Sequence, residues 1–244
     1  MNLKNKVILI TGAAQRVGRA IAGRLAQDNP RLVIHYNRSE VSARKFVREL
    51  AKADVEATAL QADLADPFQI GRLVKETVHA FGTVDVLINN AAIFYRTPFP
   101  EISLQDWEKF MRVNLRAPFL LSREAGKIML EKRAGAIVNI ADVGGIRPWS
   151  DFIPYSVSKA GVVMLTQSLA KALAPNVRVN AVAPGPVLLP ENYTEADEAI
   201  SSGRTLLKRV GSAKDVAETV YFLLTGSDFI TGAIIPVDGG RVIL

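Results

Sequence analysis

The sequence predicts an α/β protein whose parallel sheet is covered by helices on both faces. Short, almost wholly apolar segments alternate with longer segments of helical periodicity from one end of the chain to the other. Continuous apolar runs, rather than alternating ones, are typical of parallel strands buried on both sides. Strand–helix alternation also favours right-handed βαβ units. We therefore expect a single-domain Rossmann fold over residues 1–244, doubly wound around seven parallel strands.

Each expected strand is a short apolar run bounded by turn or helix signals. In chain order the strands are Lys6–Thr11, Leu32–Tyr36, Glu56–Gln61, Val84–Asn89, Ala136–Ile140, Val177–Val182 and Ala233–Val237. A long helix is expected to begin near Tyr155 and to end before Pro175. The segment 184–203 is rich in proline and polar residues, which predicts a mobile loop that covers a site as a lid. Three other helices have start signals: Asp66 before Pro67, Ser103 with Asp106, and Ser212 with Asp215.

Composition excludes several classes of site. The 244 residues include no cysteine, which excludes disulfides, thiolate metal sites and a cysteine nucleophile. The two histidines are too few for a histidine-rich metal centre, so no metal is expected. No apolar run approaches the roughly 20 residues of a membrane span, and we expect a cytoplasmic protein with no membrane partner. The net charge of +6 comes from dispersed Lys and Arg, which favours a generally basic surface over a nucleic-acid site.

The turn after the first strand, TGAAQRVG at 11–18, has features of a dinucleotide-binding turn. Gly12 and Gly18 allow the backbone to approach a pyrophosphate, and the following helix offers unpaired N–H groups to it. Turns of this kind usually carry another glycine near position 16, where this chain has Arg16. The guanidinium of Arg16 is expected to bind a cofactor phosphate or an acceptor-rich substrate, and the alternative is a solvated arginine.

The end of the second strand predicts which dinucleotide is bound. NAD-preferring folds tend to place an acid there, whereas this chain has Asn37, Arg38 and Ser39. Arg38 can pair with a ribose 2′-phosphate, and its two neighbours can donate to the phosphate oxygens, so NADPH is expected. The alternative is that Ser39 only caps the next helix and that Arg38 is solvated. Asp63, after the third strand, is expected to hold the adenine amino group.

Acid–base chemistry is predicted at Tyr155 and Lys159 of the YSVSK segment, which lie one helical turn apart on the same face. The ordinary tyrosine pKa of about 10 is too high for acid–base work near neutrality. A neighbouring ammonium and an oxidised nicotinamide would favour the phenolate, so we expect the pKa of Tyr155 to be lowered.

Taken together in this order, these motifs resemble the short-chain dehydrogenase/reductase family along essentially the whole chain. The other matching features are Asn89-Asn90-Ala91, Asn114, and Pro184-Gly185. The resemblance implies an Asn, Ser, Tyr and Lys catalytic group, of which Asn114, Tyr155 and Lys159 match three. Asp142 stands where the serine is expected. The cofactor residues that the resemblance implies are Gly12, Arg16, Val17, Gly18, Asn37, Arg38, Ser39, Asp63, Leu64, Asn90, Ala91, Ala92, Tyr155, Lys159, Pro184, Gly185 and Val187.

Arg16 and Asp142 together resemble one branch of that family, the pteridine reductases, which carry TGxxxRxG and an aspartate in place of the serine. HYNRS at 35–39, QADL at 61–64 and NNAAIFYRTP at 89–98 are similar too. The resemblance implies reduction of a dihydropterin or dihydrofolate with NADPH by a homotetramer. The substrate would contact Arg16, Phe94, Asp142 and Tyr155, with its flat ring stacked on Phe94. Ala92 and Phe152 depart from the branch pattern, where serine and tyrosine are common.

Two other functions are compatible with the sequence. A 3-oxoacyl-carrier-protein reductase or a general carbonyl reductase would share the fold and the cofactor, but it would carry serine in place of Asp142. A non-enzymatic NADPH-binding sensor or scaffold is opposed by the presence of Asn114, Tyr155 and Lys159, because such a protein has no need of a catalytic set.

Overall fold

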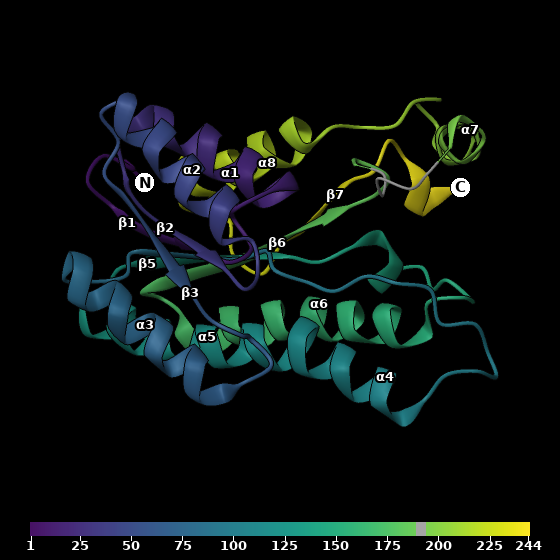
Figure 1. Ribbon diagram of the computed structural model, residues 1–244, viewed down its shortest axis with the longest axis horizontal. Coiled ribbons are helices and arrows are strands. Elements are labelled where there is room, and N and C mark those ends of the chain that lie inside the picture. The colour runs from purple at the N-terminus through teal and green to yellow at the C-terminus, as the bar shows by residue number, and fades with distance from the viewer. Residues whose placement is uncertain (189–193) are drawn as a thin grey trace.

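One parallel sheet of seven strands organises the chain, as the computed structural model shows for residues 1–188 and 194–244 (Figure 1). The strand order is β3-β2-β1-β4-β5-β6-β7, and every neighbouring pair is parallel. This order confirms the predicted doubly wound fold. The strands are β1 (Val7–Ile10), β2 (Arg31–Tyr36), β3 (Ala57–Gln61), β4 (Val86–Asn89), β5 (Gly135–Ile140), β6 (Val177–Pro184) and β7 (Ile234–Val237).

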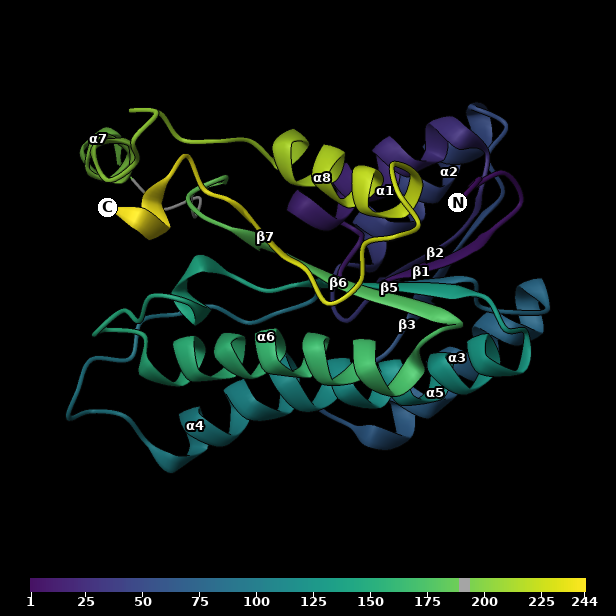
Figure 2. The same ribbon diagram turned by 180° about the vertical axis from the view of Figure 1, so that it is seen from behind.

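Helices cover both faces of the sheet, and the two views from opposite sides agree on the layers (Figures 1 and 2). One layer holds α1 (Arg16–Leu25), α2 (Glu40–Lys52) and α8 (Ala213–Thr225). The other holds α3 (Pro67–Phe81), α4 (Leu104–Phe110), α5 (Ala117–Glu131) and α6 (Ile153–Leu173). The π-helical turn Met111–Arg116 joins α4 to α5, and α7 (Glu195–Gly203) lies beyond the carboxyl ends of the strands.

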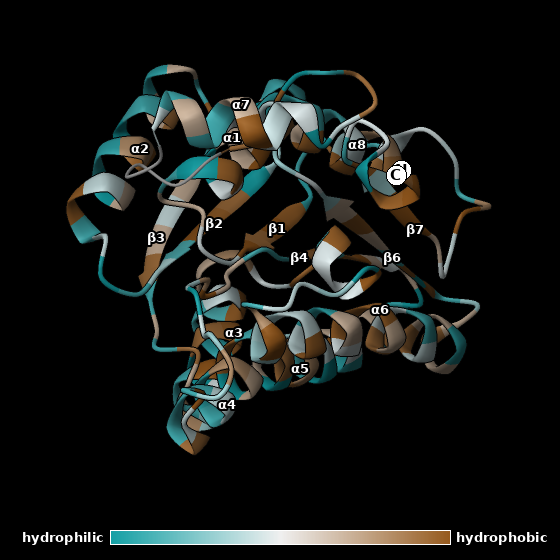
Figure 3. Cartoon of the chain, turned by 90° about the vertical axis from the view of Figure 1, so that its right-hand side faces the viewer, coloured by the Kyte–Doolittle hydropathy of each residue, from teal (hydrophilic) through white to brown (hydrophobic). Residues whose placement is uncertain are grey.

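Two hydrophobic cores form because successive strand side chains point to opposite faces of the sheet. In β1, Ile8 and Ile10 pack towards α1, α2 and α8, whereas Leu9 packs towards α3 and α5. All three are fully buried. Figure 3 shows the same pattern, with brown residues facing the sheet and teal residues outside.

Local start signals form the caps that the sequence predicts. The Asp66 side chain accepts a hydrogen bond from the Phe68 N–H, and Ser103/Asp106 and Ser212/Asp215 form complete capping boxes. Helix α6 begins at Ile153, two residues before Tyr155, and it ends before Pro175 as expected.

The predicted loop over 184–203 needs correction. Part of it is helix α7, which Thr194 and Asp197 start with a third capping box. The same S/T-x-x-D spacing was recognised elsewhere in the chain, but here the preceding prolines concealed it. Residues 189–193 of the predicted lid lie outside the described residues.

The path of the chain places a crevice at one edge of the sheet. It runs from β1 outwards through β2 to β3, then returns to β4 on the other side of β1. Loops after β1 and β4 therefore diverge at the carboxyl ends of adjacent strands. In open parallel sheets this switch point is where ligands bind.

Candidate active site

A cleft of about 1500 Å³ lies over the carboxyl ends of the strands. Of the residues predicted for cofactor, substrate and catalysis, all line this cleft except Asn114. They come from the loops after β1, β2, β3, β4, β5 and β6 and from the start of α6. The fold therefore collects residues that are up to 175 positions apart, from Gly12 to Val187, into one volume.

The β1–α1 turn is held rigidly and has no room for side chains. Gly12 has φ +64°, a left-handed conformation that glycine adopts without steric cost. A Cβ at Gly18 would lie 2.3 Å from the Gly12 carbonyl oxygen. On the β4 side, Asn90 Nδ2 donates to the Thr11 carbonyl at 2.8 Å, and the Thr11 hydroxyl oxygen accepts from Asn90 N at 2.9 Å. Such a bare, anchored turn before a helix N-terminus fits a dinucleotide pyrophosphate.

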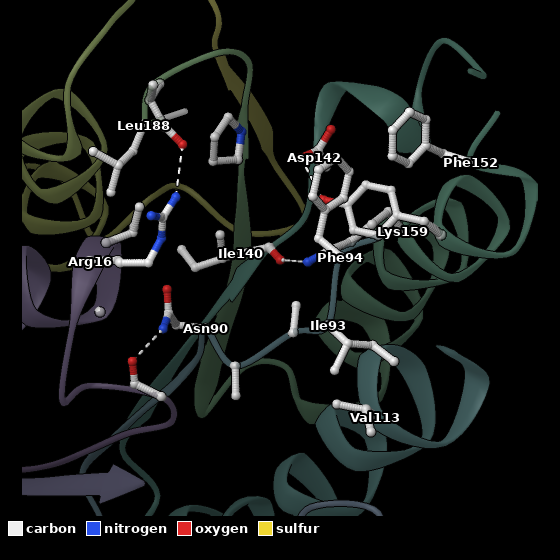
Figure 4. Close-up of a pocket in the computed structure, with 18 of the residues that line it drawn as sticks. Arg16, Asn90, Ile93, Phe94, Val113, Ile140, Asp142, Phe152, Lys159 and Leu188 are labelled. Carbon is white, nitrogen blue, oxygen red and sulfur yellow. Dashed lines mark hydrogen bonds between the residues drawn. The ribbon is translucent and has the colours of Figure 1, made fainter. Parts of the chain in front are cut away.

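Arg16 occupies the first position of α1 with φ +53°. For a residue with a side chain, the left-handed conformation costs roughly 1–2 kcal/mol. Its guanidinium crosses the top of the cleft, where Nη2 donates to the Leu188 carbonyl at 3.0 Å (Figure 4). Arg16 therefore joins the β1–α1 turn to the segment after β6, in the part of the cleft that the glycine turn forms.

The segment after β2 presents polar side chains to the cleft. Asn37 and Arg38 are exposed, and Ser39 precedes α2 without a capping bond from its hydroxyl to the helix. The alternative interpretation of Ser39 as a side-chain cap is thus not what the structure has. Asp63 uses Oδ1 to accept from Ala65 N at 2.9 Å and faces the same region.

His35 is a positioning residue whose role the sequence does not indicate. It is 1% exposed, and its ring spans two loops. Nδ1 accepts from Gly12 N at 3.1 Å, and Nε2 donates to the Ala62 carbonyl at 3.0 Å. Burial lowers the pKa of His35 to about 4, against opposing contributions from Ala62 and Asp63. Both partners are backbone atoms, which is why no residue pattern in the sequence indicated them.

Asp142 and Tyr155 form the centre of the chemical end of the cleft. The Tyr155 hydroxyl donates to Asp142 Oδ2 at 2.7 Å, and Gly144 N donates to Asp142 Oδ1 at 2.7 Å. Asp142 keeps part of its surface open to the cleft, but its carboxyl group lies deep, and desolvation raises its pKa. The hydrogen bonds from the Gly144 N–H and the Tyr155 hydroxyl oppose that rise in pKa, and so does the positive charge of Lys159.

The neighbours of Tyr155 in the protein act against the lowered pKa that is expected from a nearby ammonium together with a bound oxidised nicotinamide. Burial and then the charge and hydrogen bond of Asp142 raise the pKa of Tyr155 well above 10. The Lys159 ammonium lies over the Tyr155 ring, 5.9 Å from its centre, and donates its hydrogen bond to the Ile140 carbonyl at 2.7 Å (Figure 4). Burial is thus the largest influence on the Tyr155 pKa, and Asp142 adds to it by its charge and its hydrogen bond.

Lys159 is itself buried, and desolvation lowers its pKa to about 8 although Asp142 raises it. The direction follows from the cost of holding an ammonium away from water. All three groups at this end of the cleft are thus shifted towards their neutral forms.

Asn114 lies behind the cleft wall, within the π-helical turn Met111–Arg116. Its Oδ1 accepts from Ile93 N at 2.8 Å, and its Nδ2 donates to the Ile93 carbonyl at 3.0 Å and to Ser158 Oγ at 3.2 Å. The side chain therefore ties the loop after β4 to α6. Such π-turns inside helices are frequent at functional sites.

Aromatic rings form one wall beside Tyr155. Phe94 stacks on Phe152 with centroids 4.8 Å apart and an interplanar angle of 2°, and it meets the Tyr155 ring edge-on at 4.8 Å. Phe94 is 43% exposed, so it retains surface for a further ring. Trp149 lies nearly parallel to Tyr155, at 6.2 Å, and also lines the cleft. No motif in the sequence distinguishes Trp149 as part of this wall.

The described residues offer neither a metal-ion site nor a membrane-spanning helix. In residues 1–188 and 194–244, His, Cys, Asp and Glu side chains do not gather in threes as a metal ion would require. Within the same part of the chain, none of the helices has the length and apolar character needed to cross a membrane.

Comparison with known proteins places the chain in a large group. The family model described as enoyl-(acyl carrier protein) reductase matches residues 12–241. A 3-oxoacyl-[acyl-carrier-protein] reductase from Synechocystis sp. is 36% identical, with 98% of each chain covered. A 3beta-hydroxysteroid dehydrogenase from Eggerthella lenta is 33% identical over 99% of this chain and 95% of its own length. The crystal structure of a blue fluorescent protein from a metagenomic library, in complex with NADPH, superposes with a TM-score of 0.92, at 34% identity and with 99% of both chains covered.

Proposed function

The chain belongs to the short-chain dehydrogenase/reductase family of NAD(P)-dependent oxidoreductases, and we propose that it reduces a dihydropterin or dihydrofolate with NADPH. The observation that carries the proposal is the hydrogen bond between Tyr155 and Asp142. A serine in place of Asp142 would be a neutral donor at any pH. Asp142 instead places a carboxyl group, whose pKa burial raises, in hydrogen-bond contact with the Tyr155 hydroxyl, so that the pair can hold and pass on a proton.

Two adjacent acids suit reduction of a C=N bond, because the ring nitrogen needs a proton when the adjacent carbon receives a hydride. NADPH, when bound, supplies that hydride. The Tyr155 hydroxyl delivers the proton to the nitrogen, and Asp142 replaces it across their 2.7 Å hydrogen bond. Lys159, held by the Ile140 carbonyl, stabilises the negative charge left on the pair. Phe94 provides the face on which the flat ring stacks.

The choice of NADPH rests on the groups around the cofactor end of the cleft. A Cβ at Gly18 would strike the Gly12 carbonyl and the Asn90 side chain, so the close-packed turn that would hold a pyrophosphate requires glycine there. Arg38 after β2 would pair with the 2′-phosphate, and the structural relative named above was crystallised with NADPH. Asn37 and Ser39 would add donors to that phosphate, and Asp63 would accept from the adenine amino group.

Reduction of a 3-oxoacyl thioester or another carbonyl is the second candidate, and the curated relatives favour it. They are named as 3-oxoacyl reductases and a hydroxysteroid dehydrogenase. Their names support an oxidoreductase of this family more directly than they support a pterin substrate. Three residues of this chain favour a pterin over a carbonyl substrate: Asp142, Arg16 and Phe94.

We also propose a homotetramer, as the family resemblance implies. Apolar side chains are exposed along α6, at Val157 (43%) and Met164 (62%), and in the C-terminal segment 232–244 at Ile243 (78%). Exposed apolar surface of this kind is typical of subunit interfaces. Equilibrium sedimentation giving the mass of one 26.5 kDa chain would exclude the tetramer.

The deciding experiment follows NADPH oxidation by the purified enzyme with two sets of substrates. Dihydrobiopterin, dihydromonapterin and dihydrofolate form one set, and an acetoacetyl thioester and a diketone form the other. We expect turnover of the first set and a loss of about a hundredfold in kcat for Asp142→Ser. An enzyme that reduces only the carbonyl set, and tolerates Asp142→Ser, would show that the carbonyl candidate is right. Turnover of either set discards the sensor alternative.

A further inference from the structure

Three arginines gather at the outer end of the cleft. Arg204 follows α7, and Arg241 opens the C-terminal 3-10 turn Arg241–Ile243; both line the cleft together with Asp142 and Trp149. Arg147, in the loop after β5, acts electrostatically on Arg241. Figure 1 shows α7 and the C-terminus at the same end of the molecule, beyond the carboxyl ends of the strands.

Backbone bonds fix the positions of Arg204 and Arg241. The Gly239 carbonyl accepts from Leu206 N at 2.7 Å and from Leu207 N at 3.1 Å, so the segment after α7 is tied to the turn before Arg241. Gly240 has φ +82°, and a Cβ there would lie 2.6 Å from the Leu206 side chain. The two arginines are thus presented by a close-packed junction.

The carboxylates that face these arginines are already engaged. Asp238 accepts from Gly240 N at 2.9 Å and from Val242 N at 2.7 Å, and Asp142 accepts from Tyr155 and Gly144. Asp197, which also lines the cleft, caps α7. In the part of the chain that the structure describes, the side chains of Arg147, Arg204 and Arg241 form no ion pair.

The cluster has an unfavourable balance of charge on its own. Burial and then the nearby charge of Arg204 lower the pKa of Arg241, and Arg147 adds to this effect. Asp142 and Asp238 only partly oppose it. Like charges held together in a partly desolvated cleft cost stability unless an anion neutralises them.

Aromatic rings lead from the reacting groups to this cluster. The Trp149 ring lies 6.2 Å from the Tyr155 ring, and the guanidinium carbon of Arg241 lies 5.4 Å from the Trp149 ring. A substituent that leaves a ring stacked near Tyr155 would therefore pass over Trp149 and reach Arg241.

We propose that Arg204 and Arg241, with Arg147 behind them, bind an anionic group, carboxylate or phosphate, on the substituent of the substrate, so that the enzyme selects charged over neutral substrates. This inference rests on the proposed reductase activity of the same cleft. Under the pterin proposal it favours a folate, whose tail carries carboxylates, over a pterin with a neutral side chain.

The test compares two matched pairs of substrates, each with one anionic and one neutral member. Dihydrofolate is set against dihydrobiopterin, and acetoacetyl coenzyme A against the acetoacetyl thioester of N-acetylcysteamine. The ratio of kcat/KM for the anionic and the neutral member is measured for the wild type, Arg241→Gln and Arg204→Gln. Lys52→Gln removes the same charge at the exposed end of α2, away from the cleft, and serves as the control.

We expect the ratio to fall at least about tenfold in Arg241→Gln and to fall in Arg204→Gln, with no change in Lys52→Gln, because a hydrogen bond to a charged group is lost. A smaller ratio only in the folate pair assigns a carboxylate site, and one only in the thioester pair assigns a phosphate site. An equal loss of kcat/KM for the anionic and the neutral member of a pair would mean that the arginines only support the fold, and would overturn the proposal.

The two proposals fail in different ways. If the arginine substitutions lower the ratio in the thioester pair and pterins are not reduced, the pterin function is refuted and the anion site is kept. A ratio that the arginine substitutions leave unchanged in both pairs refutes the anion site, and turnover of the pterins in the same experiment keeps the function. If neither pair is turned over, the anion site is tested by binding. The NADP⁺-loaded enzyme is titrated in a calorimeter with folate and with biopterin, and the two dissociation constants are compared. Equal dissociation constants for the two ligands, or a preference that Arg241→Gln leaves intact, would overturn the proposal.

Discussion

The two ends of the cleft are built on different physical principles. At the cofactor end, Gly12 and Gly18 leave space around a backbone turn, and Arg38 stands in solvent. At the reacting end, Tyr155 and Lys159 are buried and Asp142 is largely enclosed. The first end offers shape and exposed charge, whereas the second holds ionisable groups whose surroundings favour their neutral forms.

This difference indicates that activity depends on side-chain identity at the reacting end, whereas cofactor binding depends on the space around the turn at the cofactor end. Substitutions at the reacting end should change the chemistry and leave binding largely intact. Substitutions at the cofactor end should change binding or stability by the size of a clash or of a single charge. Four experiments test that division, in order of decreasing expected effect.

Tyr155→Phe should produce the largest effect. It removes the proton donor at the reacting end, so kcat should fall about a thousandfold. The NADPH dissociation constant, measured by fluorescence titration, should stay within about twofold. Tyr95→Phe is the matched control, because that hydroxyl donates to Asp106 and lies outside the cleft lining. Loss of NADPH affinity equal to the loss of rate would break the division between the two ends.

His35 should make the protein sensitive to acid, because it anchors the cofactor turn only when neutral. Its pKa is lowered from 6.5 to about 4, so the unfolded chain binds more protons than the folded one between these values. Stability should therefore fall as the pH drops from about 6.5 towards 4, by up to about 3 kcal/mol.

Urea unfolding of the wild type between pH 7.5 and 4.5 measures this effect. His35→Asn should flatten the acid-side slope, and His79→Asn, which changes an exposed residue of α3, should retain it. An identical slope in all three proteins would show that the linkage lies elsewhere.

Two glycines of α1 test whether space is what the cofactor turn requires. Gly18→Ala places a methyl group against the Gly12 carbonyl and should cost about 2 kcal/mol of stability while weakening NADPH binding. At Gly23 the added Cβ meets no atom within 4 Å, so Gly23→Ala should be neutral or stabilise the helix by up to about 1 kcal/mol. Thermal unfolding with and without NADPH separates the effect on stability from the effect on cofactor binding. Equal changes in the two variants would mean that only helix propensity is affected.

Arg38→Ala should have the smallest effect, because it removes one exposed charge. We expect the affinity for NADPH to fall about tenfold and that for NADH to stay unchanged, because only NADPH carries the 2′-phosphate. Arg48→Ala, on the exposed face of α2, is the control for the change in net charge. If Arg38→Ala leaves the preference for NADPH over NADH unaltered, Arg38 does not bind the 2′-phosphate.

The sequence was sufficient wherever neighbours along the chain determine the structure. Apolar runs located the strands, and Asp66 and Ser103 located helix starts, because each acts within its own turn. It was insufficient where a contact depends on distant backbone. The partners of His35 are main-chain atoms of two other loops. The juxtaposition of Arg204 and Arg241 depends on the Gly239 carbonyl.

The surroundings of Tyr155 could not be predicted for a related reason. Sequence spacing gave the distance along the helix to Lys159 correctly as one turn, but it could not give the direction of the ammonium group. That group is bound to the Ile140 carbonyl, and the carboxyl of Asp142, in the loop after β5, lies beside the phenol. Helix α7 was missed because prolines upstream of Thr194 outweighed a four-residue start signal.

The conformation of Arg16 has a consequence for how this enzyme can diversify. The backbone at that position already has the shape that glycine prefers, so the turn does not depend on the arginine for its geometry. Replacing Arg16 with glycine would therefore remove the guanidinium and its hydrogen bond to the Leu188 carbonyl while the turn keeps its conformation. Ligand preference at this end of the cleft can thus be altered at one position, independently of the sheet and helices that form the scaffold.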